Sequence, residues 1–564
     1  MALYKEQKQT LWESRLKETE LNVSKFTENS ISSLAHYLAL KENNSEILKI
    51  TSKYYNSNIY DTFSSEYNEF VDSDYINYVI EALQSNDSFY NIISSYELSE
   101  LVFKLLKING GDIIYDLGCG NGTFLANAIK YAYQNKIVLK GLVGIEINSK
   151  QSEIAYLVSY ILTRVYQTQF DIYNKDAING KCDFPYTHAY VMPPFGAKSI
   201  SLVSLPHSKI FDYKFTNKNR TEWLYVDSML QSLGKYLHKA AAVLPMSALF
   251  DKGDFEYRSQ LIKHGYIEHI IGLPLGTISM SNVKCALVIF STENHGVKFS
   301  DVSKDIDLFK FGKQKLPVEK IVNLIESDKT IFIDNFSLIN MNSLDPSTLI
   351  LSGSVPTIEN GIKLSEAAEV FTGCQYTVKN FSDMFTPEKT NYQILTSSDI
   401  NNGVVDWNSL QYIDYKDNKF DKYALRESDL IITSKSTKVK LAVVDINPDR
   451  KILVTGGMII VRPNIEKLNP TFLKMFLETE NGQKAMQLIQ KGTTIKSMLA
   501  KDVAEIVVPN VPIEKQRDMA EKYNFKLSTL IAYKKEIEIL ENKLSNFFNE
   551  ELEGDEWYCY QLLI

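Results

Sequence analysis

Several features that would place the chain in a specialised class are missing from its sequence. The 564 residues contain only five cysteines, and none of these has the C-x-x-C spacing of a zinc or redox site. No stretch reaches the roughly 18 uncharged apolar residues that span a bilayer, and the charged N-terminus lacks the apolar run of a signal peptide. We therefore expect reduced thiols, no metal site, no membrane segment and a cytoplasmic location.

Nucleotide-hydrolysis and repeat signatures are also absent. The phosphate-binding pattern G-x-x-x-x-G-K-[ST] does not occur, and the chain has no internal repeat. The net charge of −8 argues only mildly against a nucleic-acid binder, because binding depends on where the positive charges lie. With 44% hydrophobic and 23% charged residues, the composition is that of a folded protein. The length predicts roughly two to four domains.

The spacing of apolar residues changes along the chain. Apolar residues first recur at helical spacing, and then short apolar runs alternate with helical patterns, which predicts an α/β domain with a mostly parallel sheet. Short β-rich pieces follow, and the chain closes on a long helical pattern. The predicted parts are a helical N-terminal region (1–105), an α/β domain (106–300), a connector (301–360), an α+β domain (361–515), a long helix (516–550) and a tail (551–564).

The strongest local signal is a glycine-rich turn after the apolar run that ends at Asp116. Glycines at alternate positions permit positive φ and let a ligand lie against the backbone, and the next helix presents free N–H groups to that ligand. Asp116 suits a cationic amino group, and Glu146, at the end of the next strand, suits two ribose hydroxyls. This pattern is typical of Rossmann-like methyltransferases that bind S-adenosylmethionine, although the glycines alone leave a hydride-transferring enzyme open. The predicted cofactor-binding residues are Asp116, Gly118, Gly120, Asn121, Gly122, Glu146 and Asp176.

A second motif, Val191-Met192-Pro193-Pro194-Phe195-Gly196, ends the fourth predicted strand. Adenine-N6 methyltransferases carry Asn-Pro-Pro-Phe/Tyr here, and residues 75–300 resemble the modification subunits of type I restriction systems. The resemblance implies a DNA adenine-N6 methyltransferase that takes its target base out of the duplex. In that family, acceptors around the target amine draw electron density onto its nitrogen, and the aromatic residue stacks on the base. The implied catalytic residues are Met192, Pro193, Pro194, Phe195 and Asp176.

Two departures from the family pattern bear on activity. Met192 replaces the usual Asn, and a thioether accepts hydrogen bonds only weakly. Ser94-Ser95-Tyr96-Glu97 stands where relatives have Phe-Thr-Pro, so the family pattern does not tell which residues form that part of the cofactor-binding wall. Three interpretations follow: another acceptor such as Asp176 has taken over, or the domain binds cofactor and DNA with little or no methyl transfer, or Met192 is an ordinary apolar residue of a fold without adenine chemistry.

The C-terminal half, residues 360–550, resembles the target-recognition domains of type I specificity subunits. The matching segments, in order, are Lys363–Gly373, Ile394–Ile400, Ser428–Thr433, Lys491–Lys496, and Val507–Pro509 with Pro512–Gln516. The resemblance implies that this half reads DNA sequence. Basic and polar residues there are predicted to contact phosphate oxygens, with plain surface solvation as the alternative. These predicted DNA contacts are Lys435, Lys438, Lys440, Lys491, Thr493 and Lys496.

The long C-terminal helix carries an apolar seam at alternating spacings of three and four residues. The seam consists of Leu530, Tyr533, Ile537, Leu540, Leu544 and Phe547. A full specificity subunit has two recognition domains and two such helices, so a two-fold homodimer is the predicted assembly on double-stranded DNA. Packing on the chain's own methyltransferase domain, or on another chain, are the alternatives. Because the sequence carries no nuclease or helicase signature, cleavage would need a separate nuclease or translocase subunit at the bacterial nucleoid.

Overall fold

The chain forms two compact units, residues 1–350 and 351–564. In the computed structural model, no described helix is long and apolar enough to cross a membrane. The structure describes residues 28–554 apart from the segments 55–56, 58–59, 62–63, 65, 85–93, 180–184, 197–205, 279–282, 307, 309–314, 354–357, 375–380, 382–383, 416–418, 436–438, 446–448 and 491–496, and it leaves the side chains of 546–554 undescribed.

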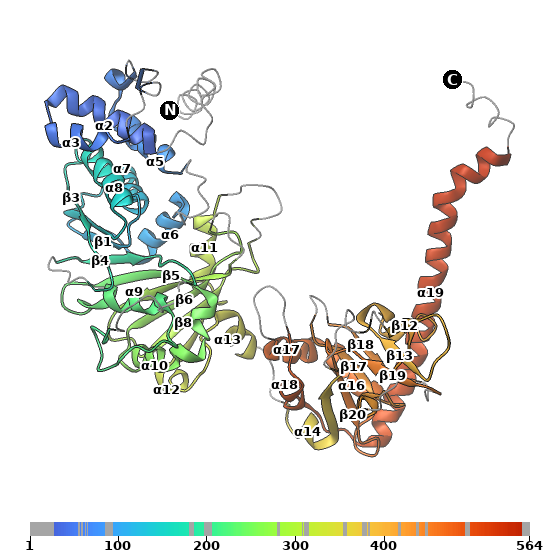
Figure 1. Ribbon diagram of the computed structural model, residues 1–564. Coiled ribbons are helices and arrows are strands. Elements are labelled where there is room, and N and C mark those ends of the chain that lie inside the picture. The colour runs from blue at the N-terminus through green and yellow to red at the C-terminus, as the bar shows by residue number, and fades with distance from the viewer. Residues whose placement is uncertain are drawn as a thin grey trace. The chain divides into compact units, whose positions relative to one another are not determined.

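The first unit is built on one sheet whose nine described strands run in the order β3-β2-β1-β4-β5-β7-β6-β8-β9 (Figure 1). All neighbouring strands are parallel except where β7 and β9 run antiparallel to the others. The strands are β1 (Ile113–Leu117), β2 (Gly141–Glu146), β3 (Gln169–Asn174), β4 (His188–Val191), β5 (Lys239–Pro245), β6 (Ile267–Gly272), β7 (Cys285–Phe290), β8 (Gly296–Asp301) and β9 (Ile331–Asp334). The predicted α/β architecture with a mostly parallel central sheet is confirmed.

Helices cover both faces of this sheet, because successive strand residues point to opposite faces and both sets are apolar. Ile114 faces α7 and α8, whereas Tyr115 faces α9 and α10. The covering helices are α6 (Tyr96–Leu106), α7 (Thr123–Asn135), α8 (Ser149–Leu162) and α11 (Val318–Ile325) on one face, and α9 (Thr221–Leu230), α10 (Phe255–Lys263), α12 (Asn335–Leu338) and α13 (Pro346–Gly353) on the other.

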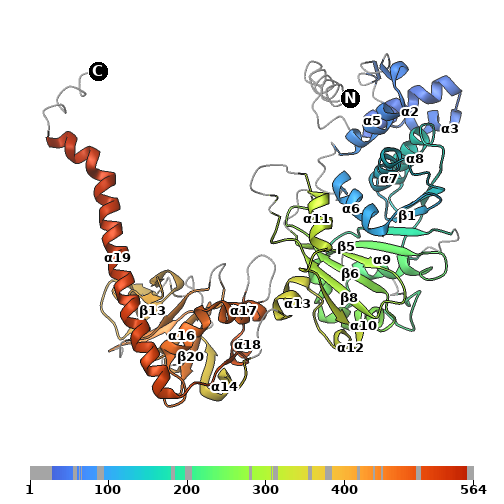
Figure 2. The same ribbon diagram turned by 180° about the vertical axis from the view of Figure 1, so that it is seen from behind.

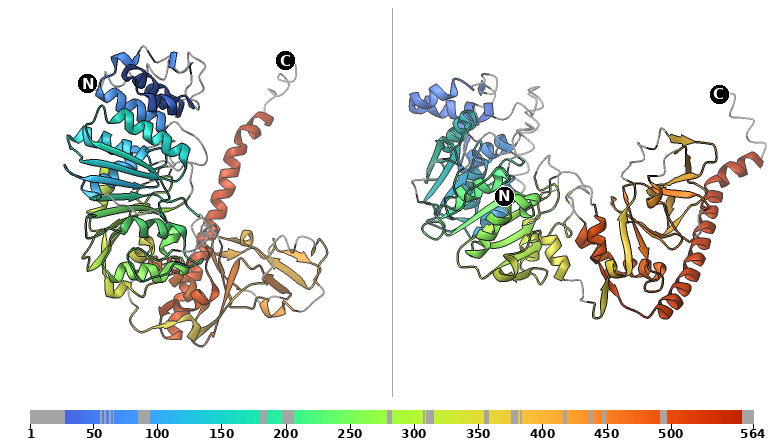
Figure 3. Two further views of the ribbon diagram at one scale, coloured as in Figure 1. Left: turned by 60° about the vertical axis from the view of Figure 1, so that its left-hand side comes forward. Right: turned by 60° about the horizontal axis from the view of Figure 1, so that its bottom comes forward.

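The N-terminal helices form an outer layer over α7 and α8 (Figures 1 and 3). They are α2 (Glu28–Glu42), α3 (Ser45–Thr51) and α5 (Asp72–Gln84). Buried tyrosines hold this layer together: the hydroxyls of Tyr67 and Tyr78 lie 2.9 Å apart, and their rings meet edge to face.

The sheet extends beyond the predicted α/β boundary at residue 300. Strand β9 and helices α11 and α12 lie within the segment 301–360 that we predict as a connector, and β9 pairs with β8. Ile331 and Ile333 are half-buried, and Phe332 between them is exposed. This alternation covers only three residues in a polar segment, which is too short to predict a strand from the sequence. The connector is therefore shorter than expected.

The second unit contains two small four-stranded sheets. One is antiparallel, in the order β11-β20-β17-β18, and the other is mixed, in the order β12-β16-β13-β19. Its strands are β10 (Gly361–Lys363), β11 (Ala368–Thr372), β12 (Phe385–Thr386), β13 (Tyr392–Leu395), β14 (Ile400–Asn401), β15 (Val404–Val405), β16 (Gln411–Ile413), β17 (Leu430–Thr433), β18 (Leu441–Val443), β19 (Lys451–Val454), β20 (Met458–Pro463) and β21 (Val507–Pro509). Its helices are α14 (Leu364–Ala367), α16 (Pro470–Glu478), α17 (Glu480–Ile489), α18 (Ala500–Ala504) and α19 (Ile513–Gly554).

Helix α19 packs on the second unit through its first turns, and farther along the helix Lys534 Nζ donates a hydrogen bond to Asn402 Oδ1 at 2.9 Å. The buried Gln516 side chain accepts a hydrogen bond from Asn469 N at 2.8 Å and donates one to Val511 O at 2.7 Å. Seven residues later, Tyr523 Oη meets buried Lys474 Nζ at 2.9 Å. Beyond these contacts the helix extends past the strands of its own unit (Figure 2), and its side chains are mostly exposed.

Candidate functional site

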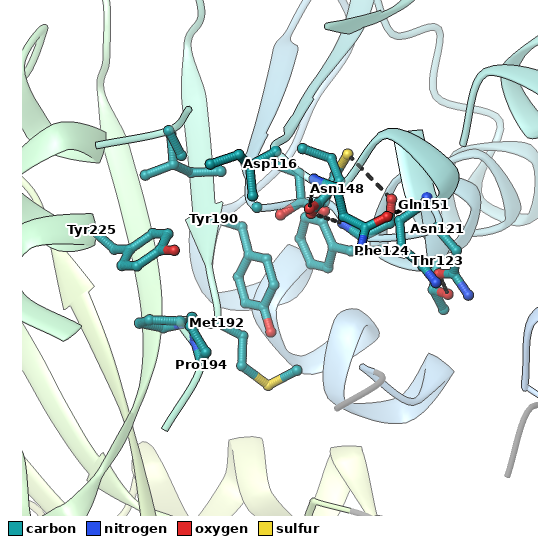
Figure 4. Close-up of a pocket in the computed structure, with 18 of the residues that line it drawn as sticks. Asp116, Asn121, Thr123, Phe124, Asn148, Gln151, Tyr190, Met192, Pro194 and Tyr225 are labelled. Atoms are coloured by element: carbon teal, nitrogen blue, oxygen red, sulfur yellow. Dashed lines mark hydrogen bonds between the residues drawn. The ribbon is translucent and has the colours of Figure 1, made fainter. Parts of the chain in front are cut away.

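A cavity of about 350 Å³ opens at the carboxyl edge of the parallel strands. It lies where β1 and β4 sit side by side although the chain visits β2 and β3 between them. In open α/β sheets, ligands bind at such a reversal of strand order. The lining residues come from Ser94, the segment after β1, the ends of β2 and β4, the segment after β3, and helix α9 (Figure 4).

The turn after β1 has the backbone conformation that its glycines permit. Gly118, Gly120 and Gly122 all have positive φ, at 85°, 56° and 86°. A side chain at Gly120 would point into open space, so the absence of a Cβ there leaves room for a ligand. The turn is fixed to β2, because the N–H groups of Gly118 and Cys119 both donate to Ile145 O at 2.9 Å.

Glu146 ends β2 and faces the same turn. Its Oε2 accepts a hydrogen bond from Gly120 N at 3.0 Å, and its Oε1 accepts one from Asn148 N at 2.7 Å. Each carboxylate oxygen keeps a lone pair for a further donor. The carboxylate is therefore held in place by backbone groups and still presents two acceptors to the cavity.

Asp116 lies at the base of the turn and is 3% exposed. Burial, together with the nearby negative charge of Glu146, raises the pKa of its carboxyl group well above the usual range. Within the described part of the chain, no group donates a hydrogen bond to this carboxyl group. A cation bound beside Asp116 would reverse the burial effect by pairing with the carboxylate.

The cavity is acidic overall. Asp116, Glu146 and Asp176 line it, and the described lining contains no Lys, Arg or His. A dinucleotide pyrophosphate would meet three carboxylates and no counter-charge, which is electrostatically unfavourable. The charge pattern fits a cationic ligand and not a phosphorylated one, so it argues against the hydride-transfer alternative.

The Met192–Phe195 segment closes another side of the cavity. Met192, Pro193 and Pro194 line it, whereas Phe195 is half-buried, packs against the core of the α7 face and is not among the lining residues. The segment ends at Gly196, whose N–H donates to Glu222 Oε1 at 3.2 Å.

Asp176 lines the cavity but is engaged by its own turn. Its Oδ1 accepts a hydrogen bond from Ile178 N at 2.8 Å, and its Oδ2 accepts one from the side chain of Asn179 at 2.7 Å. These bonds hold the carboxylate against the segment after β3. Because Oδ1 also accepts a hydrogen bond from Asn179 N at 3.4 Å, a lone pair for a ligand is left on Oδ2.

Comparison with known proteins finds a family model that is similar to the first unit. Residues 58–335 match the family model described as N-6 DNA Methylase. The match spans just under half of the chain. The match covers the whole described sheet from β1 to β9 and stops where the first unit approaches its end.

Two curated proteins to which the chain is similar are methylase subunits of type I restriction enzymes. The MjaVIII subunit of Methanocaldococcus jannaschii is 25% identical over 203 residues, 32% of this chain and 33% of the relative. The MpnII subunit of Mycoplasma pneumoniae is 24% identical over 255 residues, 41% of this chain and 47% of the relative. The chain thus matches between a third and a half of the length of these relatives.

One similar solved structure is the type I restriction-modification methyltransferase subunit of Streptococcus thermophilus. It has a TM-score of 0.43 and 19% sequence identity, with coverage of 52% of this chain and 68% of that chain.

The match to N-6 DNA methylases implies S-adenosylmethionine as the cofactor, and the residues that line the cavity fit it. This ligand carries a sulfonium and an ammonium group, and the cavity offers carboxylates without competing cations. It also carries a ribose, for which Glu146 presents its two fixed oxygens. The open space at Gly120 and the free N–H groups at the start of α7 complete the contact surface.

Several cavity residues were not singled out from the sequence. Phe124 and Tyr190 stack with ring centroids 3.9 Å apart, and Tyr225 reaches the cavity from α9. Tyr190 was detectable in principle, because it precedes Met192 by two residues on the same predicted strand. Tyr225 lies in a helix that is buried on all sides and carries no motif, so no local pattern marks it. Asn148 and Gln151 also line the cavity from the start of α8.

The predicted DNA contacts lie in the second unit and are described only in part. Lys438, Lys491, Thr493 and Lys496 fall outside the described residues. Lys435 is exposed at a bridge to Ser497. The Lys440 ammonium donates to Ser397 O at 2.7 Å and Ile400 O at 2.8 Å, so two of its three N–H groups are already used.

Proposed function

We propose that the chain is an S-adenosylmethionine-dependent DNA methyltransferase that acts on the N6 amine of adenine. The observation that carries this proposal is one acidic cavity bordered both by the Asp116–Gly122 turn and by the Met192–Pro194 segment. The match of residues 58–335 to N-6 DNA methylases supports it. Modification and sequence reading would then lie in one chain of a restriction-modification or phage-defence system in the bacterial cytoplasm.

Each side of the cavity would have its own task in this reaction. The bound cofactor supplies an electrophilic methyl group. Asp116 binds the ammonium group, and Glu146 binds the ribose hydroxyls. Pro193 offers its carbonyl oxygen to the target amine. Phe195 follows the lining residues and packs against the core, so its ring would have to turn towards the cavity to stack on the flipped base.

The second unit is proposed to read the DNA sequence. Its resemblance to target-recognition domains supports this role, and so does its separation from the methylase region as a compact unit with its own apolar cores. Lys435 and the four predicted contacts outside the described residues are proposed to approach phosphate oxygens. A separate nuclease or translocase subunit would supply cleavage.

A second candidate function is a catalytically silent, sequence-specific DNA-binding protein. The observation that favours it is Met192, whose thioether faces the cavity where the family has an amide. Loss of one fixed polar contact lowers a rate by roughly a hundred- to a thousandfold.

Label transfer separates the two functions. The protein is incubated with tritiated S-adenosylmethionine and genomic DNA from a strain without its own methylation, and cofactor binding is measured by calorimetry. We expect label in N6-methyladenine. Tight cofactor binding without label transfer would establish the silent DNA-binding protein instead.

A further inference from the structure

A pair of hydroxyl groups stands in the cavity wall close to the substituted position. Tyr190 Oη and Ser94 Oγ lie 2.9 Å apart, and both residues line the cavity. The Tyr190 ring is fixed by stacking on Phe124, with an interplanar angle of 13°. Ser94 is fixed as well, because its carbonyl oxygen accepts a hydrogen bond from Asn127 Nδ2.

Tyr190 and Met192 point to the same side of β4. Strand residues alternate between faces, and Val191 between them packs into the core of the opposite face. At the other end of the tyrosine, Asp116 is its register partner on β1. In Figure 4 the Tyr190 hydroxyl lies on the side of Met192 and away from Asp116. The phenol therefore reaches towards the target-base end of the cavity and not towards the proposed ammonium site.

The Tyr190 side chain thus lies next to both positions at which the sequence departs from the family pattern. Ser94 belongs to the segment that replaces Phe-Thr-Pro, and Met192 replaces Asn. Tyr190 contacts the first and shares a strand face with the second. Burial raises the pKa of the Tyr190 hydroxyl, so it is a neutral phenol at physiological pH. When this phenol donates its proton to Ser94 Oγ, both lone pairs of its oxygen are free to accept.

We propose that Tyr190 accepts a hydrogen bond from the N6 amine of the target adenine, in the role that the missing Asn side chain has in the family. This inference rests on the proposed methyltransferase function. The amine nitrogen forms its bond to the methyl carbon while the carbon–sulfur bond of the sulfonium group breaks, so the positive charge passes to the nitrogen until an amine proton leaves to solvent. A fixed acceptor on the N–H stabilises that charge. Ser94 is a positioning residue, because its Oγ accepts a hydrogen bond from the phenol O–H and so orients the lone pairs of the phenol oxygen.

Removing one oxygen atom tests the assignment. Tyr190→Phe keeps the ring that stacks on Phe124, and we expect it to lower the single-turnover rate of methyl transfer by roughly ten- to a hundredfold. Binding of S-adenosylhomocysteine, measured by calorimetry, should stay within twofold of wild type. Ser94→Ala is the matched control, because it leaves the phenol in place and should lower the rate less than Tyr190→Phe does.

A rescue variant distinguishes a contact to the base from a structural role. Met192→Asn restores an amide acceptor, and in the Tyr190→Phe background it should recover at least tenfold of the lost rate. A wild-type rate in Tyr190→Phe would overturn the proposal. So would a parallel loss of S-adenosylhomocysteine affinity, which would assign the hydroxyl to the cofactor. If neither the wild type nor Met192→Asn transfers label, the methyltransferase function itself is wrong. If only Met192→Asn does, Tyr190 is no substitute for the amide.

Discussion

Asp116 determines how the cavity responds to pH. Its carboxyl group has a raised pKa because it is buried next to Glu146, so the free protein holds a proton there to a higher pH than an ordinary Asp does. Binding the ammonium group of the cofactor requires the carboxylate, and it therefore releases that proton. Cofactor affinity should rise as the pH rises through the raised pKa and should fall below it.

Asp116→Asn should weaken cofactor binding by roughly ten- to a hundredfold and remove most of this pH dependence, since the amide cannot pair with the ammonium group. Calorimetry in two buffers with different ionisation enthalpies measures the released proton. Equal proton release by the wild type and the variant would contradict the role given to Asp116.

Gly144 lies in the middle of β2 and packs closely against Cys119 of the glycine turn. A Cβ added there would lie 2.7 Å from Cys119 Sγ and 2.8 Å from Ile172 Cδ1. Gly144→Ala should therefore destabilise the protein by about 1–3 kcal/mol, measured by urea denaturation, and weaken cofactor binding through displacement of Cys119. Gly141→Ala is the control on the same strand, because its nearest contact would be 3.4 Å away. Equal losses in both variants would refute the packing argument.

Among the elements, β6 carries a buried histidine whose charge the sheet disfavours. Burial first, and then the positive charge of Lys298, lower the pKa of His269 to about 4, while its Nε2 lies 2.8 Å from Ser300 Oγ on β8. The unfolded chain binds a proton near pH 6.5 and the folded chain does not, so stability is lost as the pH falls from 6.5 towards 4. We expect a loss of about 2 kcal/mol from this residue between pH 7 and pH 5.

Denaturation midpoints of the wild type and His269→Gln at the two pH values check this expectation. The variant should lose less stability on acidification than the wild type does. An identical pH dependence would assign the effect to other groups, among them His188, whose pKa is also lowered by burial.

Elements with a strong local pattern were predictable, and those defined by distant contacts were not. The apolar runs at Ile113–Tyr115, Leu142–Ile145 and Ala286–Phe290 are strands of the sheet, because a sheet buried on both faces requires uninterrupted apolar residues. The edge strand β9 has apolar residues half-buried on one side only, so it lacks an uninterrupted apolar run and was not predicted.

The same contrast holds inside the cavity. The glycine turn and the Pro193-Pro194 pair form sequence motifs, and the structure places them around one space. Tyr225 and Ser94 reach that space from a helix and from the segment before α6, and no spacing in the sequence links them to it. The engagement of Asp176 by Ile178 N and Asn179 could be seen only in three dimensions.

At the scale of the whole molecule, the exposed seam of α19 is proposed to pair two chains. Leu530, Tyr533, Ile537, Leu540 and Leu544 are all exposed, and a seam of this kind is normally buried against another helix. Sedimentation should show a dimer for the wild type. Truncation before Gln516 would also remove residues packed in the core of the unit, so substitution is the cleaner change.

Ile537→Lys with Leu540→Lys should convert the dimer to a monomer without changing the unfolding temperature of the second unit. Ile539→Lys with Asn542→Lys, on the opposite face of the helix, should leave the dimer intact. A wild-type monomer, or a dimer that survives both pairs of changes, would remove α19 from the interface.

The support beneath the Met192–Gly196 segment has a consequence for engineering the protein. Glu222 is fully buried, and its Oε1 accepts hydrogen bonds from Gly196 N and, at 2.9 Å, from Arg220 Nη2. Among the described residues, Glu222 Oε2 and Arg220 Nε have no hydrogen-bond partner. Such groups lower stability, and apolar replacements of similar volume often raise it. A screen for thermal resistance should therefore select apolar replacements of Glu222 and Arg220. These more stable variants should transfer methyl groups more slowly, because they no longer hold Gly196 in place.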